Sequence, residues 1–131
     1  MRISTKGRYA LSLLVDLSKE EKGKYTSLKV VSERLDISYK YLEKIANMLV
    51  KNNLLEVLRG KQGGYRLLKD PSNYNIAEIL KLTEKSMESV ECVENPSVCK
   101  NKERCKKNTF YKKLDEVVEN YLESVSLEDI I

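Results

Sequence analysis

Apolar residues near the start of the chain fall at the three- and four-residue intervals that place side chains on one face of a helix. The first run consists of Tyr9, Ala10, Leu13, Leu14 and Leu17. It begins after Ser4 and Thr5, either of which can cap a helix, and Gly23 lies beyond its end. The pattern therefore predicts a first helix between these capping residues and the glycine.

Two shorter helical patterns follow, separated by Asp36, Ile37 and Ser38. Ser27 can cap the earlier helix and Ser38 the later one. Their apolar residues are Leu28, Val31 and Leu35 in the earlier pattern and Leu42, Ile45, Ala46 and Leu49 in the later one. Two short helices with an apolar residue in a tight connection are typical of a helix-turn-helix motif, although any small helical bundle can show this spacing.

The pattern changes to alternation between residues 55 and 69. The alternating residues are Leu55, Val57 and Arg59 before a glycine-rich tip and Tyr65, Leu67 and Lys69 after it. The sequence therefore predicts a hairpin, whose tip glycines permit positive φ and close backbone approach. Arg59, Lys61 and Arg66 place positive charge around the tip. A helix-turn-helix followed by a basic hairpin is a winged helix, so the predicted fold is mostly helical with a small β-hairpin wing.

The second half of the chain predicts two further helices on either side of a polar loop. Asn75 with Glu78 three residues later resembles a capping box, which opens the first of these helices. The second helix carries a continuous apolar stripe: Leu114, Val117, Val118, Tyr121, Leu122 and Val125. Ser126 and Asp129 can cap one last turn at the end of the chain.

An apolar stripe of this length must be covered by other apolar surface. A small winged-helix core leaves little to cover it, so the same helix of a second subunit is the economical partner and predicts a homodimer. The alternative is that the helix packs on its own domain. The predicted organisation is a winged helix-turn-helix domain at 1–85, a cysteine-containing loop at 86–107, and a dimerisation helix with a terminal turn at 108–131.

Charge is distributed unevenly along the 131 residues. Residues 1–66 hold 14 Lys and Arg against 7 Asp and Glu, a net charge of +7, whereas residues 67–131 hold 10 against 13, a net charge of −3. The basic half favours a polyanion as partner, although a solvated basic surface would look the same. We expect a cytoplasmic protein without a membrane partner, because no run of about 20 apolar residues and no signal-peptide pattern is present.

Candidate DNA-binding residues lie on the later helix of the predicted motif and in the wing. They are Ser38, Tyr39, Lys40, Glu43 and Lys44 on the helix, with Arg59, Lys61, Gly63 and Gly64 in the wing. Lysine and arginine suit phosphates, whereas Glu43 is either a solvated bystander or a base reader that accepts from the amine of cytosine. In a two-fold dimer two such helices would meet a pseudo-palindromic site in double-stranded DNA.

The three cysteines, Cys92, Cys99 and Cys105, lie in one loop, and the chain has no histidine. Their spacing is too wide for the short knuckles of structural zinc sites. Thiolates in a loop can hold an iron-sulfur cluster, although three reduced thiols in a solvated loop are the plainer interpretation. A thiol enzyme is disfavoured because a cysteine nucleophile usually needs a histidine base. We therefore expect that the protein is not an enzyme.

Four segments carry a resemblance to known proteins: MRISTKGRYAL, SYKYLEKIANMLVKNNLLEVLRGKQGGYRL, the three-cysteine loop and SLEDI. Together they resemble the IscR, NsrR and CymR family of bacterial winged-helix regulators. The resemblance is closest to the IscR-like iron-sulfur regulators. It implies a homodimer paired through the long carboxyl-proximal helix and DNA reading by residues at Lys40, Glu43 and Arg59. It also implies an iron-sulfur cluster on the three cysteines, of 2Fe-2S type in preference to 4Fe-4S.

The chain departs from the family pattern at two places. Six residues separate the first two cysteines where the IscR pattern has five, and Asn108 stands where that pattern has a histidine. The fourth cluster ligand is therefore unidentified. The function expected is a dimeric regulator whose promoter binding is modulated by the cluster and which controls cluster assembly or sulfur metabolism. The alternative is a cluster-free thiol-sensing or cysteine-metabolism repressor that acts with a protein partner.

Overall fold

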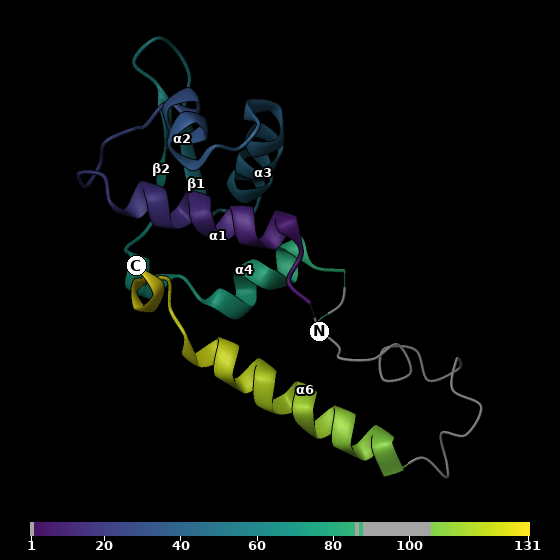
Figure 1. Cartoon of the computed structure of the whole chain (residues 1–131). Helices are drawn as coiled ribbons and strands as arrows, with labels where there is room; N and C mark the ends of the chain where they lie inside the picture. Colours follow the sequence, from purple (N-terminus) through teal and green to yellow (C-terminus); the bar gives the residue numbers. More distant parts are fainter. Residues whose placement is uncertain (1, 86, 88–105) are drawn as a thin grey trace.

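The computed structural model describes residues 2–85, 87 and 106–131 of the chain. A two-stranded hairpin projects from one end of a helical head and a long helix extends from the other (Figure 1). The elements, in chain order, are α1 (Thr5–Ser18), α2 (Leu28–Leu35), α3 (Tyr39–Lys51), β1 (Leu55–Leu58), β2 (Gly64–Leu67), η1 (Pro71–Asn73), α4 (Ile76–Thr83), α6 (Lys106–Ser124) and η3 (Glu128–Ile130). None of the helices in these ranges is long and apolar enough to cross a bilayer.

Helix α1 is the central support of the head. Its cap is Ser4, whose Oγ accepts a hydrogen bond from the Gly7 N–H at 3.0 Å. The apolar face predicted for this helix is buried at Ala10, Leu13, Leu14 and Leu17. The Ser4 N–H also donates to Oε1 of Glu84 at 2.7 Å, which fastens the start of α1 to the end of α4.

Helices α2 and α3 form the predicted helix-turn-helix. Asp36 ends α2 in a left-handed conformation, with φ of 53°, and Ile37 points into the core with 9% of its surface exposed. Ser38 caps α3 by accepting from the Tyr41 N–H at 3.5 Å. Ser27 stands at the start of α2 as expected, but its side chain forms no capping hydrogen bond, so that part of the prediction is wrong.

The wing is an antiparallel pair whose register runs from Leu55 opposite Leu67 to Leu58 opposite Gly64. Thr26, just before α2, forms an isolated antiparallel bridge with Tyr65, since its N–H and C=O both bond the backbone of Tyr65 at 2.9 and 2.8 Å. This bridge joins the wing to the residues that lead into the helix-turn-helix.

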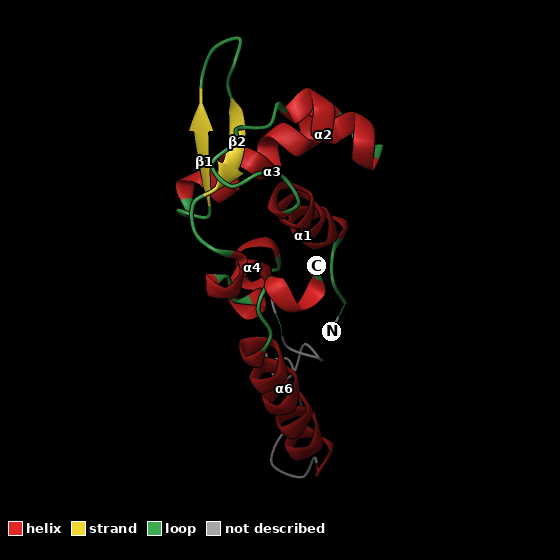
Figure 2. Cartoon of the chain, turned by 90° about the vertical axis from the view of Figure 1, so that its left-hand side faces the viewer, coloured by secondary structure: helices red, strands yellow, loops and turns green. Residues whose placement is uncertain are grey.

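The end of the chain returns to the head and completes its core. The C-terminus lies next to the head and not at the far end of α6 (Figure 2). Leu127 is fully buried, and its N–H donates to the carbonyl of Tyr74 at 3.0 Å. The predicted final turn is present, because Asp129 Oδ2 accepts from the Ser126 N–H at 2.9 Å. Asn75 caps α4 as predicted, by accepting from the Glu78 N–H at 3.2 Å.

Helix α6 is long, as predicted, and touches the head mainly near its carboxyl end. Lys81 of α4 pairs with Glu119 at 2.9 Å and reaches Glu123 at 3.8 Å. Its apolar stripe remains largely uncovered, since Val117 is 53% exposed and Tyr121 is 60% exposed. Packing on its own domain therefore accounts for only part of this helix.

Candidate nucleic-acid interface

The outer face of α3 collects the helix residues predicted to meet DNA. Tyr39, Lys40, Glu43 and Lys44 are all exposed, and Asn47 continues the same face one turn further on. The opposite face is buried at Leu42, Ile45, Ala46 and Leu49. This division follows from the 3.6-residue period, because apolar residues at the predicted spacing must all turn inward.

The amino end of α3 adds a favourable place for a phosphate. Ser38 caps the helix, and no acidic side chain lies in its first turn. A helix start presents unpaired N–H groups and the positive end of the helix dipole. With Lys40 next to it, this end suits a phosphate and positions the helix for contact with base edges.

The glycines of the wing have steric reasons for their positions. A Cβ added at Gly63 would overlap the carbonyl oxygen of Leu58, and one added at Gly64 would overlap that of Thr26. Gly64 also has φ of 154°, which few residues with a side chain adopt. Both glycines therefore shape the wing, whatever contact their backbones make with DNA.

Arg66, which was expected to place positive charge around the tip of the wing, is instead held by residues near the base of the wing. Its Nε pairs with Oε2 of Glu56 at 2.8 Å, and its guanidinium donates to the carbonyl of Gly23 at 2.9 Å. The group also lies over the ring of Tyr25, 4.3 Å from its centroid. The strand register explains this arrangement, because Glu56 and Arg66 stand directly opposite each other.

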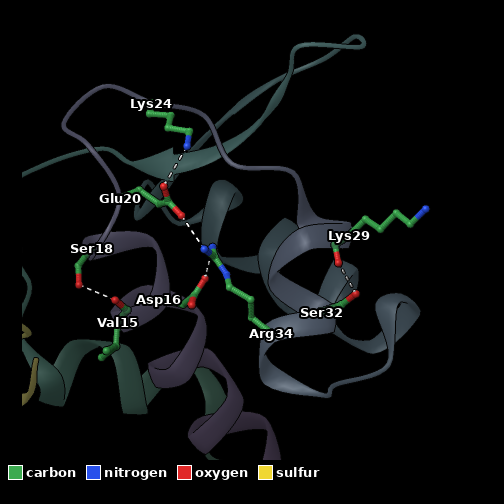
Figure 3. Close-up of polar contacts among 8 residues, drawn as sticks. All are labelled: Val15, Asp16, Ser18, Glu20, Lys24, Lys29, Ser32 and Arg34. Atoms are coloured by element: carbon green, nitrogen blue, oxygen red, sulfur yellow. Dashed lines mark hydrogen bonds and ion pairs between the residues drawn. The ribbon is translucent and has the colours of Figure 1, made fainter.

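Arg34 is likewise bound within the head. It links α2 to the end of α1 by ion pairs of 2.8 Å to both Asp16 and Glu20, and Lys24 adds a 3.3 Å contact to Glu20 (Figure 3). The hydrogen bonds from Arg34 and then Lys24 lower the pKa of the Glu20 carboxyl. These positive charges are therefore balanced locally.

The cations predicted to bind DNA differ from Arg34 and Arg66 in this respect. Within the described ranges, Lys40, Lys44, Arg59 and Lys61 form no ion pair. All four are exposed on α3 or at the adjacent wing. Positive charge that no ion pair balances is therefore present where the helix and the wing project from the head, and such charge can meet the phosphates of a duplex.

A groove runs between α3 and the wing. It is lined by Glu43, Asn47, Val50, Lys51, Val57, Arg59 and Tyr65. The Tyr65 hydroxyl crosses it and donates to Oδ1 of Asn47 at 3.2 Å. Burial raises the pKa of the Tyr65 phenol, and the nearby Glu43 and Tyr39 raise it further, against an opposite effect of Arg59. The sequence pattern identified Tyr65 only as a strand residue, because alternation does not show what its hydroxyl meets.

Arg59→Gln is expected to weaken duplex binding and to reduce the slope of log affinity against log salt concentration by roughly one, the effect of one lost phosphate contact. Fluorescence anisotropy at several salt concentrations measures both quantities. Lys112→Gln, which removes the same charge from the exposed side of α6, should leave the slope unchanged. An Arg59→Gln slope equal to that of the wild type would exclude a phosphate contact.

The predicted cluster ligands Cys92, Cys99 and Cys105 lie outside the described residues. The described part of the site is therefore the surface of α3 and the wing.

A helix-turn-helix with an adjoining hairpin, and with unpaired cations on the face that they share, defines a winged-helix DNA-binding protein. The chain belongs to the Rrf2 family, described as iron-dependent transcriptional regulators, whose model matches residues 3–131. The predicted family and fold class are confirmed. The relatives are regulators of transcription, so the prediction that the chain is not an enzyme is confirmed as well.

Individual relatives show how far the similarity extends. The chain is 33% identical over 131 residues to the transcriptional regulator IscR of Photorhabdus laumondii, which covers all of this chain and 79% of the relative. The structure of CymR, the global cysteine regulator of B. subtilis, has a TM-score of 0.81 and 30% identity, with 99% of this chain and 95% of that one covered. IscR of T. potens has a TM-score of 0.77 and 28% identity, with coverage of 99% and 85%.

Proposed function

We propose that the chain acts in the cytoplasm as a homodimeric transcriptional regulator. Its paired winged helices would bind a pseudo-palindromic site, and an iron-sulfur cluster on Cys92, Cys99 and Cys105 would modulate that binding. The observation that carries the DNA-binding part is the winged helix-turn-helix itself, on which Lys40, Lys44, Arg59 and Lys61 are exposed on α3 and the adjoining wing. The regulated process would be cluster assembly or sulfur metabolism.

The homodimer is supported by the uncovered stripe of α6. Phe110, Leu114, Val117 and Tyr121 are between 40% and 63% exposed, although they recur at the spacing of a packed helix face. Contiguous exposed apolar surface of this kind marks an interaction site. A second copy of α6 is the partner that the chain itself supplies, and two-fold pairing would place two α3 helices on one side of the assembly.

DNA recognition would divide between positioning and reading. Lys40, Lys44 and Lys61 would contact phosphates, which fix the register of the protein on the duplex. Glu43 lines the same groove as Arg59, and its carboxylate can accept from an exocyclic amine of cytosine. Arg59 would contact backbone phosphates or insert its side chain into the minor groove.

The iron-sulfur part of the proposal is supported by the donor set and by the relatives. Thiolate sulfur is the ligand that iron-sulfur clusters use, and three thiols in one segment supply three of the four positions. A cluster bound there would supply an oxygen- and redox-labile group next to the dimer helix. Asn108 replaces the histidine of the IscR pattern, so the fourth ligand would be Asn108 itself, Glu103, a carboxylate from elsewhere or a small molecule, unless one iron stays open.

The similarity to CymR favours a second candidate function. That structure is named as the global cysteine regulator of B. subtilis, and a further neighbour is the oxidized form of CymR of Staphylococcus aureus, at 30% identity and a TM-score of 0.77. In this alternative the three cysteines of the chain act as thiol sensors without iron, and a protein partner conveys the signal. Both candidates share the DNA-binding surface and differ in what the thiols hold.

Anaerobic purification distinguishes the two candidates. We expect a brown protein with iron and sulfide in equal amounts, and a change in duplex affinity after exposure to oxygen. Cys92→Ala should lose the colour, the iron and the oxygen response together, because three thiols are the minimum that the proposal requires. Colourless, iron-free protein whose duplex affinity still responds to a thiol oxidant would exclude the cluster and support the thiol sensor.

A further inference from the structure

The hydrogen bond between Tyr65 and Asn47 joins the wing to the outer face of α3. Tyr65 lies on β2 with backbone partners on both sides, since it pairs with Val57 in β1 and exchanges two hydrogen bonds with Thr26. Its side chain is half-buried against the core, and this packing restricts where the hydroxyl can lie. Asn47, by contrast, is exposed on the surface that faces DNA in the proposed function.

We propose that Tyr65 is a positioning residue for DNA recognition, which holds the Asn47 carboxamide with its NH2 group turned toward the major groove. The inference rests on the proposed entry of α3 into that groove. A carboxamide has one acceptor oxygen and one donor NH2 group, and a free side chain can present either of them. A proton donated to Oδ1 removes this ambiguity, because the NH2 group must then point away from Tyr65.

The direction of the bond follows from the Asn47 atom that lies next to the phenol, which is the acceptor Oδ1. Burial and the carboxylate of Glu43 both raise the pKa of Tyr65, which is consistent with a hydroxyl that carries its proton and donates it. A protonated hydroxyl next to the carboxamide oxygen donates to it at 3.2 Å. Within the described structure no hydrogen bond joins Tyr65 to Glu43, so that carboxylate stays available for DNA.

This orientation specifies a base preference. An outward NH2 group donates, so it matches an edge that carries only acceptors in the major groove, such as O6 and N7 of guanine. Glu43 lies one helical turn before Asn47 and only accepts, so it matches the amine of cytosine. Together the two side chains would read donor and acceptor edges at neighbouring positions, and the orientation of one of them depends on the wing.

A double-mutant cycle on the full-length protein tests the inference. A preferred duplex is first selected from random sequences, and affinity is then measured for it, for single base-pair changes and for an unrelated duplex. Tyr65→Phe should reduce discrimination roughly three- to tenfold, the effect of one hydrogen bond, at the base pairs that Asn47→Ala also relaxes. The double variant should discriminate no worse than Asn47→Ala alone, and binding to unrelated duplex should not change.

Two further variants separate positioning from general stability. Asn47→Asp turns an oxygen outward in place of the NH2 group, so its preference should move from acceptor edges toward the amines of cytosine or adenine. Tyr74→Phe removes a buried hydroxyl that bonds the Leu54 carbonyl and the Leu68 N–H, so it should lower the melting temperature without affecting discrimination.

Full discrimination by Tyr65→Phe, or losses that multiply in the double variant, would overturn the inference while leaving the proposed function intact. A wild-type protein that binds all duplexes equally would instead overturn the proposed function itself.

Discussion

Val117→Glu is expected to turn the protein into a monomer and to lower its affinity for a palindromic duplex by at least roughly 100-fold, the smaller end of what a linked second site contributes. Val117 is 53% exposed in one protomer, and in the proposed dimer it would lie between the two copies of α6. Symmetry places the new carboxylate there twice. Burying unpaired charge costs several kcal/mol per group, which exceeds what one apolar contact returns.

Light scattering after size-exclusion chromatography measures the mass, and anisotropy with a palindromic and a half-site duplex measures binding. Lys112→Gln is the matched control, since it changes the charge of the same helix by the same amount at an exposed position away from the stripe. It should remain dimeric. A dimeric Val117→Glu protein, or a wild type that is monomeric at micromolar concentration, would contradict pairing through α6.

The second large effect is expected just after the carboxyl end of α6, in the last turn of the chain. Leu127→Ala should destabilise the fold by roughly 2–5 kcal/mol, the range for removing a fully buried leucine side chain. Leu127 has no exposed surface and belongs to the core formed by α1, α3 and α4. The variant should also loosen the end of α6. The buried Leu127 side chain holds this segment against the head, where the Leu127 N–H bonds the Tyr74 carbonyl and the Ile76 N–H bonds the Val125 carbonyl.

Urea unfolding followed by circular dichroism measures this loss. Ile131→Ala provides the comparison, because that residue is 52% exposed four positions further on and should change stability by less than about 0.5 kcal/mol. Equal stability of Leu127→Ala and the wild type would show that the end of the chain is not part of the core.

Hydrophobic spacing alone was sufficient to predict the helices and the wing. The faces of α1 and α3 are buried where the three- and four-residue intervals placed them, and the alternation at 55–69 predicted the two strands. These signals are local, because a residue's burial in a helix or strand depends on its neighbours within one or two turns. Capping by Ser4, Ser38 and Asn75 was predictable for the same reason.

Contacts between distant residues were not predictable in this way. Arg66 had the same basic character as Arg59 in the sequence, but the strand register places it opposite Glu56 and so removes it from the tip. The sequence placed Leu127 only within a terminal turn, whereas in the structure it lies in the core and its N–H hydrogen-bonds the Tyr74 carbonyl. The contact between Tyr65 and Asn47 spans 18 positions, and neither residue's own pattern indicates the other.

The sequence by itself determined the class of fold, the lysines and arginines on α3 and the wing, and the apolar stripe of α6. The reason is that composition and periodicity fix which surfaces must be buried and which stay in water. The tertiary structure decided which cations remain unpaired and which side chain crosses the groove. The physical reason is that ion pairs and hydrogen bonds need contact within about 3–4 Å. Only the folded chain brings residues from different elements that close together.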